Sequence, residues 1–240
     1  MNQLTPTLTI LLLETTTSVC SVAVVRDGVV LAERRSTEPN AHSAQMAVFV
    51  DEMLRQLSMR PADLDAVCVS GGPGSYTGLR IGVSYAKGMC YALQKPLLAV
   101  PTLQAMAEYY FLTHTDFDGW VCPMLDARRM ECYTAFYARV ADGVEEKRSV
   151  CADVIESGIY DSILDVHPVV FFGDGAAKTA PLLSVHPRAH YDERQPMTAV
   201  ALWSAACRQL RQGRVEDVAY YEPFYLKDFV AKKTVVRGLR

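Results

Sequence analysis

The segment from Ala66 to Leu93 constrains the fold more than any other part of this sequence. It opens with A-V-C-V-S, whose three central apolar residues predict a short buried strand. The glycine-rich run G-G-P-G-S-Y-T-G follows, and the sequence after it predicts a helix of about four turns from near Gly78. Glycine permits a tight turn between the two, and Ser75 or Thr77 can cap the helix. A strand, a glycine turn and a helix in this order indicate an α/β protein.

A turn of this kind can present backbone N–H groups to an anion, so Gly72, Gly74 and Ser75 are candidate cofactor-binding residues. The spacing excludes a Walker A loop, because no lysine directly follows the last glycine, Gly78. It also excludes the dinucleotide fingerprint G-x-G-x-x-G, because the run reads G-x-G-x-x-x-G and is one residue too long. A structural turn that binds no ligand is the alternative.

A second junction of this type lies later in the chain. The apolar run 169–172 predicts a buried strand, and G-D-G-A follows it before a predicted helix. Gly173 and Gly175 are therefore further candidates for phosphate binding, although no lysine lies in this loop and a structural turn is favoured.

The first hundred or so residues predict the element order β-β-β-α-β-α-β-α, which is a mixed sheet covered by helices. Two of the helices, 42–57 and 78–93, have apolar residues on more than one side. In the second helix, small residues recur at every fourth position from Gly78 to Cys90 and form one stripe. Such a helix is either buried within the chain or covered by a partner.

The run G-P-G-S-Y-T-G-L-R-I-G-V-x-x-A-K-G resembles the signature of the TsaB (YeaZ) family, which takes part in making threonylcarbamoyladenosine in bacterial tRNA. Three later motifs are also similar to the family's: D-A-R-x-x-E, G-D-G-A, and P-F-Y-L-K, in which Lys227 replaces arginine. The resemblance covers nearly the whole chain. It implies an actin-like ATPase (ribonuclease-H-like) fold, with two subdomains of mixed sheets flanked by helices, which we expect at residues 1–103 and 104–240.

The resemblance implies a non-catalytic scaffold subunit that works with TsaD and TsaE. TsaD transfers the threonylcarbamoyl group to the adenosine next to the anticodon in tRNAs that read codons beginning with A. The expected partners are TsaD, TsaE, a second copy of the chain when it is alone, and tRNA indirectly through the complex. ATP or ADP binding within that complex stays open. The predicted interface residues are His42, Met46, Phe49, Gly78, Gly82, Tyr85, Ala86 and Met89.

In the catalytic relative TsaD, the helix that matches the one predicted after Pro101 carries a metal-binding H-x-x-x-H motif. Thr102 and Met106 stand at the matching positions here, and neither replaces imidazole as a metal ligand. His186 and His190 have the same spacing, but the proline between them argues against a helix. The sequence therefore predicts neither a metal site nor catalytic residues.

Three alternatives to this reading are open. Asp126, Arg128 and Glu131 could form an acid/base group instead of an ion-paired turn. An autonomous actin-like ATPase or kinase is a second alternative, although the first turn lacks the superfamily's glycine after its acidic residue, Glu14. A metallopeptidase is the third alternative, and the missing histidine pair counts against it.

Composition and charge limit the partners and the cellular location that we expect. The formal net charge is −3, so the whole chain does not match tRNA electrostatically. No apolar run approaches a membrane span, and the seven cysteines form no C-x-x-C pair, so we expect reduced thiols, a cytoplasmic location and no membrane contact. Basic residues gather near the C-terminal end, as a solvated terminus or a phosphate contact: Lys227, Lys232, Lys233, Arg237 and Arg240.

Overall fold

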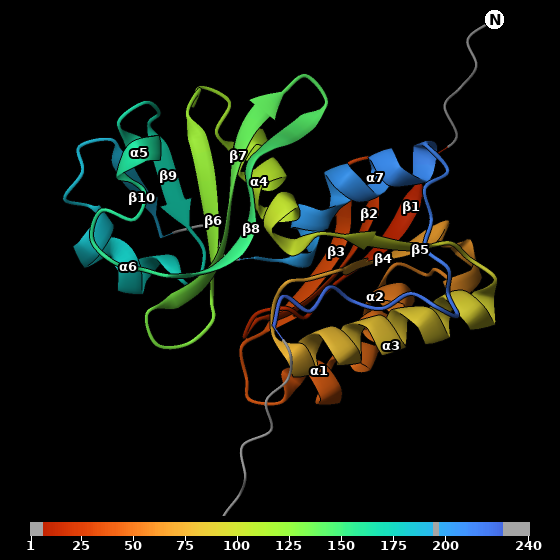
Figure 1. Cartoon of the computed structure of the whole chain (residues 1–240). Coiled ribbons are helices and arrows are strands. Elements are labelled where there is room, and N and C mark those ends of the chain that lie inside the picture. Colours follow the sequence, from red (N-terminus) through yellow and green to blue (C-terminus); the bar gives the residue numbers. More distant parts are fainter. Residues whose placement is uncertain (1–6, 194–196, 228–240) are drawn as a thin grey trace, which may run out of the picture.

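Two mixed sheets, each of five strands, organise the chain (Figure 1). A computed structural model describes residues 7–193 and 197–227. The first sheet has the order β3-β2-β1-β4-β5, in which β1 pairs antiparallel with β2 and parallel with β4. All of β1 is buried, because helices cover both faces of this sheet. The strands are β1 (Thr9–Glu14), β2 (Cys20–Arg26), β3 (Val29–Ser36), β4 (Ala66–Ser70) and β5 (Leu97–Val100).

The second sheet has the order β10-β9-β6-β7-β8. Its edge strand β8 is not among the elements that the sequence predicts. Its charged stretch E-E-K-R masks the strand signal, because an edge strand can expose charged side chains and is stabilised by its pairing with β7. The strands are β6 (Trp120–Asp126), β7 (Glu131–Val140), β8 (Gly143–Val154), β9 (Val169–Phe172) and β10 (Ala189–Asp192).

The helices follow the predicted order with two changes of boundary. The predicted helix 42–57 is divided at Gln45, and α3 begins before Gly78, with Ser75 as its cap. The Oγ of Ser75 accepts a hydrogen bond from the N–H of Gly78 at 3.2 Å. The helices are α1 (Ala41–Ala44), α2 (Met46–Gln56), η1 (Pro61–Asp63), α3 (Tyr76–Leu93), α4 (Thr102–Thr113), α5 (Asp161–Leu164), α6 (Ala176–Leu183), η2 (Ala199–Leu202) and α7 (Trp203–Arg211).

The C-terminal part of the chain returns to the first sheet, so residues 104–240 do not form a separate contiguous unit. Helices η2 and α7 pack on β1, β2 and β5. Beyond them, the N–H of Glu216 donates to the carbonyl of Leu97, and the N–H of Phe224 donates to the carbonyl of Gly71. Helix α4 lies between the two sheets and contributes to one apolar core that contains residues of both. Among the described residues, none of the helices combines the length and apolar character needed to cross a membrane.

Candidate functional site

The carboxylate at the end of β1 is enclosed by its own neighbours. Glu14 is fully buried. Its side chain accepts hydrogen bonds from the N–H of Thr16 at 2.5 Å, from the hydroxyl of Thr16 and from the hydroxyl of Ser70. Burial raises the pKa of Glu14, and these hydrogen bonds offset the effect only in part. All of the donors that Glu14 meets in the structure therefore belong to the chain itself.

The turn that follows Glu14 covers the N-terminus of α3. The N–H of Ser75 donates to the carbonyl of Thr16 at 2.7 Å, and the hydroxyl of Thr15 donates to the carbonyl of Gly78 at 2.8 Å. A Cβ at Gly78 would lie 1.9 Å from the carbonyl oxygen of Thr15. The glycine is required because two stretches of backbone touch here, so a contact within the chain occupies the position where an anion would approach.

The C-terminal segment covers the other side of the same glycine run. The carbonyl of Gly72 accepts a hydrogen bond from the N–H of Thr102, and the N–H of Gly71 donates to the carbonyl of Val100. At Gly72 the φ angle is +102°, and a Cβ would lie 2.4 Å from the carbonyl oxygen of Phe224. Of the predicted cofactor-binding residues, Gly72, Gly74 and Ser75 thus form a turn in close contact with the chain itself, and Gly72 also borders a cavity of about 830 Å³.

The second glycine junction, between β9 and α6, is packed less completely. Gly173 has a φ of +102°, and the N–H of Gly175 donates to the carbonyl of Met124 at 3.0 Å. Between these glycines, Asp174 accepts a hydrogen bond from the N–H of Asp126 at 2.9 Å. Burial raises the pKa of Asp174, and the nearby Asp126 carboxylate adds to the shift. One side of this loop remains open to a cavity.

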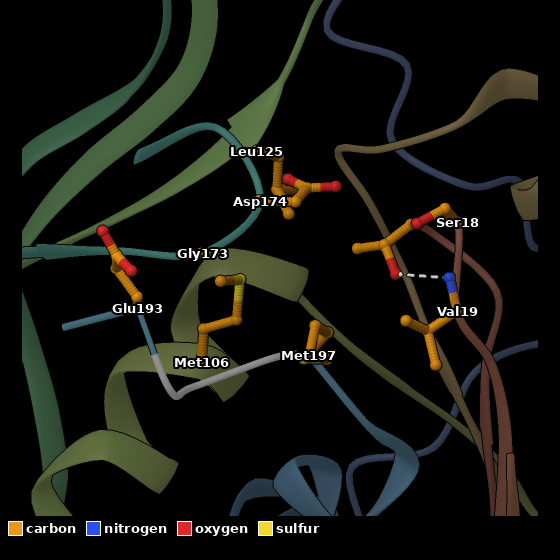
Figure 2. A pocket seen from close by; sticks show the side chains of 9 residues that line it. Ser18, Val19, Met106, Leu125, Gly173, Asp174, Glu193 and Met197 are labelled. Atoms are coloured by element: carbon orange, nitrogen blue, oxygen red, sulfur yellow. Dashed lines mark hydrogen bonds between the residues drawn. The ribbon is translucent and has the colours of Figure 1, made fainter. Parts of the chain in front are cut away.

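Figure 2 shows this cavity between the two sheets, with Asp174 projecting from one side toward Ser18 on the other. Its volume is about 140 Å³, which is below the range of about 300–1,000 Å³ for small-molecule sites. Two carboxylates line it, and no lysine or arginine among the described residues does. Such a cavity disfavours a nucleotide phosphate. Its lining consists of Thr17, Ser18, Val19, Met106, Leu125, Gly173, Asp174, Glu193 and Met197.

The turn between β6 and β7 contains the D-A-R-x-x-E motif. Lys178 on α6 forms an ion pair with Asp126 and donates to the carbonyl of Glu131 at 2.7 Å. Burial alone would raise the pKa of Asp126, but hydrogen bonds from Lys178 and from the N–H of Arg128 lower it overall. The carboxylate is therefore held ionised by neighbours, which favours the ion-paired turn over the acid/base group. Arg128 and Arg129 both adopt left-handed backbone angles, with φ of 74° and 53°.

The positions that match the relative's histidine pair carry no imidazole. Thr102 is fully buried at the start of α4, and its hydroxyl has no hydrogen-bond partner among the described residues. Met106 lines the cavity instead of a metal site. His186 contacts Asp165 at 3.3 Å, and His190 lies in β10. Within residues 7–193 and 197–227, no group of three or more His, Cys, Asp or Glu side chains could hold a metal ion.

Three of the predicted interface residues are buried inside the chain. Gly78, Gly82 and Ala86 face the first sheet, and a Cβ at Gly82 would lie 2.3 Å from the hydroxyl of Thr15. The prediction that this stripe forms an interaction surface is wrong for these residues, because small residues at every fourth position here allow α3 to approach its own sheet. The periodicity alone did not distinguish a partner from the chain's own core.

Two more predicted interface residues anchor the first helices. Met46 is buried, and His42 is half-buried with its Nε2 unpaired among the described residues. Burial lowers the pKa of His42, although contacts with the backbone of Val19 and Thr17 partly offset this effect. His42 therefore fixes α1 against the turn after β1.

The outward side of α2 and α3 holds the rest of the predicted interface. Phe49, Tyr85 and Met89 are partly buried at this surface. Val48, which is 49% exposed, and Gly88, whose Cβ position faces open space, lie on the same two helices. Neither residue is among those predicted for the interface. The interface on α2 and α3 stays a prediction, and burial limits it to the outward residues of these helices.

The C-terminal segment joins the family motifs that are far apart in sequence. The ring of Tyr225 lies 4.9 Å from the ring of Tyr76 in the first turn of α3. Two residues later, Lys227 forms an ion pair with Glu131 at the β6–β7 turn. The basic residues of the tail beyond Lys227 lie outside the described residues.

The cysteines offer no activated nucleophile. Six of the seven are buried, and Cys151 is partly exposed. Burial raises the pKa of the Cys20, Cys90 and Cys132 thiols to about 11. These groups are protonated at neutral pH, as expected for structural thiols in an apolar interior.

Comparison with known sequences adds to this geometry. The family model described as "TsaD: tRNA N6-adenosine threonylcarbamoyltransferase" matches residues 31–235. The "tRNA threonylcarbamoyladenosine biosynthesis protein TsaB" of Bacillus subtilis is 37% identical over 130 residues, which are 54% of this chain and 55% of that protein. The protein of the same name from Escherichia coli is 28% identical over 238 residues, which cover 93% of this chain and 96% of that protein. The chain thus spans about half of the first relative and nearly all of the second.

Comparison with solved structures confirms the fold. An uncharacterised Pseudomonas aeruginosa protein with similarity to peptidase YEAZ has a TM-score of 0.80 at 24% identity, covering 92% of this chain and all of that one. An activator of 2-hydroxyisocaproyl-CoA dehydratase from Clostridium difficile, solved with bound ADPNP, has a TM-score of 0.51 at 9% identity, covering 88% and 99%. The chain has the expected actin-like ATPase fold, with two mixed sheets flanked by helices.

Proposed function

Because the chain belongs to the TsaB (YeaZ) group within the tRNA N6-adenosine threonylcarbamoyltransferase family, we propose that it is a non-catalytic scaffold subunit in the making of threonylcarbamoyladenosine in tRNA. In this role the chain holds a TsaD-type subunit, which carries out the transfer, and a TsaE-type ATPase joins the pair. The tRNA substrate reaches the chain through this complex, in the cytoplasm.

The main support for the non-catalytic role is that other segments of the chain pack closely against the first glycine junction. In a nucleotide-binding relative, this junction and the first turn would be free to approach phosphate. Here the turn after Glu14 lies against Gly78, and the segment around Phe224 lies against Gly72. The cavity beside Asp174 is small and acidic, the larger cavity beside Gly72 is lined by no lysine or arginine among the described residues, and Thr102 and Met106 supply no imidazole. A chain built this way has a role in binding a partner and not in chemistry.

The outward side of α2 and α3 is the surface that we assign to the partner. Val48, Phe49, Tyr85 and Met89 give it apolar character, and the Cβ position of Gly88 on α3 faces open space. Apolar side chains that remain at a surface mark a site for association. The same surface can form a homodimer when the partner is absent.

The test uses size-exclusion chromatography with light scattering, on the chain alone and mixed with a TsaD-type subunit. We expect a mixed complex for the wild type and its loss for Gly88→Arg, because the added side chain projects from an open position of α3. Val185→Arg is the matched control, since Val185 is 79% exposed on the second subdomain. If Gly88→Arg forms the mixed complex as the wild type does, the interface lies elsewhere on the chain.

A reconstitution assay tests the division of roles. Threonylcarbamoyl transfer to a tRNA transcript should require this chain together with TsaD-type and TsaE-type subunits. Product formation by this chain without the TsaD-type subunit would refute the non-catalytic role. Failure of the chain to form any complex with that subunit would refute the scaffold.

A measurement of nucleotide binding distinguishes the scaffold hypothesis from the alternative of an autonomous ATPase or kinase. We expect calorimetric titration of the chain alone with Mg-ATP or Mg-ADP to show no binding in the micromolar range, because no lysine or arginine among the described residues lines the cavity beside Asp174 or the cavity beside Gly72. The same titration of the mixed complex reports whether a site is completed there. Tight binding by the isolated chain would favour the ATPase reading.

A further inference from the structure

A cluster of exposed arginines and half-buried tyrosines lies where three segments of the chain meet. The first turns of α3 carry Tyr76 and Arg80, and the β6–β7 turn carries Arg128 and Arg129. The C-terminal segment connects the two elements. We call this cluster the arginine–tyrosine surface, and it consists of Tyr76, Arg80, Arg128, Arg129, Tyr225 and Lys227.

Contacts within the surface make it continuous. The guanidinium of Arg80 lies over the ring of Tyr76, 5.2 Å from its centroid, and Tyr76 packs on Tyr225. Lys227 reaches Glu131 at the base of the β6–β7 turn. Only one residue separates Tyr225 from Lys227, so the two span at most about 7 Å. The segment 225–227 therefore links the two arginine-bearing elements.

The acidic groups of the β6–β7 turn are already neutralised. Lys178 pairs with Asp126, and Lys227 pairs with Glu131. Arg128 contributes only a weak electrostatic effect on Asp126, and neither its guanidinium nor that of Arg129 has a side-chain hydrogen bond or salt bridge to another described residue. The pairing leaves two uncompensated positive charges at the tip of the turn, and Glu222 is the one exposed carboxylate that acts on Tyr225.

The backbone holds these arginines outward. Both residues adopt the left-handed conformation, which is costly for side chains with a Cβ. Hydrogen bonds keep the turn in this shape: the N–H of Ala127 donates to the carbonyl of Glu131, and the N–H of Arg128 donates to the Asp126 carboxylate at 2.7 Å. The turn is thus a fixed platform that presents two guanidinium groups.

We propose that the arginine–tyrosine surface binds the sugar–phosphate backbone of RNA. Guanidinium groups recognise phosphate through paired hydrogen bonds. A positive surface on a chain of net charge −3 favours a polyanion over a neutral partner. The choice of tRNA as the RNA rests on the proposed function. With this contact, the scaffold subunit would itself contribute to substrate binding.

Fluorescence anisotropy with a labelled tRNA transcript tests the proposal on the full chain and on its mixture with a TsaD-type subunit. The variant Arg128→Gln/Arg129→Gln removes the two charges. The matched control, Arg55→Gln/Arg214→Gln, removes the same charge from exposed positions on α2 and after α7. We expect the first variant to weaken binding by about tenfold or more near 100 mM salt, and to reduce the salt slope of log K by about 2.

Each result decides the matter. A selective loss of tRNA binding by Arg128→Gln/Arg129→Gln, with the mixed complex intact on light scattering, supports the proposal. Equal losses in both variants would show non-specific attraction and overturn it. Loss of the mixed complex would assign the surface to a protein partner, and absence of tRNA binding by the wild type in both forms would also refute the proposal. Because complex formation is measured separately, a failed RNA contact leaves the scaffold role intact.

Discussion

The two strand–glycine–helix junctions are similar in sequence and different in their surroundings. At the β4–α3 junction, the turn after Glu14 covers one side of the glycines and the Phe224 segment covers the other. At the β9–α6 junction, the loop around Asp174 borders a cavity. The comparison teaches that glycine spacing reports how closely a backbone is approached, but it does not report whether the approaching group is a ligand or the chain itself.

The substitution Gly78→Ala at the β4–α3 junction is expected to have the largest effect on stability. Gly78→Ala places a Cβ 1.9 Å from a backbone oxygen of Thr15, which cannot move without disturbing the end of β1. We expect the free energy of unfolding to fall by about 3 kcal/mol or more, at the upper end of overpacking costs. Urea denaturation followed by circular dichroism measures this change.

A second glycine of the same helix provides the control. The Cβ of Gly88→Ala would meet no atom within 4 Å, and alanine is the better helix former. We expect this variant to gain about 0.5–1 kcal/mol in the free energy of unfolding. Equal destabilisation of both variants would mean that helix α3 does not touch the turn after β1.

Each junction has an acidic side chain beside it, Glu14 at the first and Asp174 at the second, and the pH dependence of stability tests both. Burial raises the pKa of Glu14 and of Asp174 in the folded chain, so the folded state binds the proton more tightly than the unfolded state. The contribution of each of these two groups to stability is then fully present below the unfolded pKa and falls as pH rises through the raised folded one, by up to about 1.4 kcal/mol per pH unit for one group.

The substitution Glu14→Gln should flatten this pH dependence more than Asp174→Asn does, because Glu14 is fully buried while Asp174 borders the cavity. Urea titrations of the wild type and both variants at several pH values measure the difference. A wild type whose stability rises with pH in this window, relative to Glu14→Gln, would contradict the assigned direction of the pKa shift.

A smaller effect is expected at the second junction. A Cβ at Gly175 would lie 3.0 Å from the sulfur of Cys132, and the φ of −83° is ordinary for alanine. We expect Gly175→Ala to lower the free energy of unfolding by about 1 kcal/mol. A loss as large as that of Gly78→Ala would erase the contrast between the junctions.

The smallest effect concerns the link between the two regions. Lys227 and Glu131 form an ion pair at the surface, and Lys227 is about half exposed. Exposed pairs contribute little, so Lys227→Met should change the free energy of unfolding by about 0.5 kcal/mol or less. A change of several kcal/mol would show that this ion pair fixes the C-terminal segment in place.

Much of the fold could be predicted because local patterns and packing agree over long stretches. The apolar run before Ser70 and the glycine turn after it specify β4 and α3. The prediction was weakest where pairing with a neighbour overrides local character. Strand β8 is polar along much of its length and exists because β7 pairs with it. Helix α7 packs on the first sheet, which a linear division of the chain did not anticipate.

The sequence by itself determined most of the element order, the family and the closeness of backbone contacts at the glycines, because these properties depend on residue types at fixed spacing. Only the tertiary structure decided which group makes those contacts. It turned the stripe from Gly78 to Cys90 toward the chain's own sheet, and it brought Tyr225 and Lys227 beside Tyr76 and the β6–β7 turn. Spacing along a helix fixes which residues share a face, whereas the surroundings of that face depend on segments that are distant in the sequence.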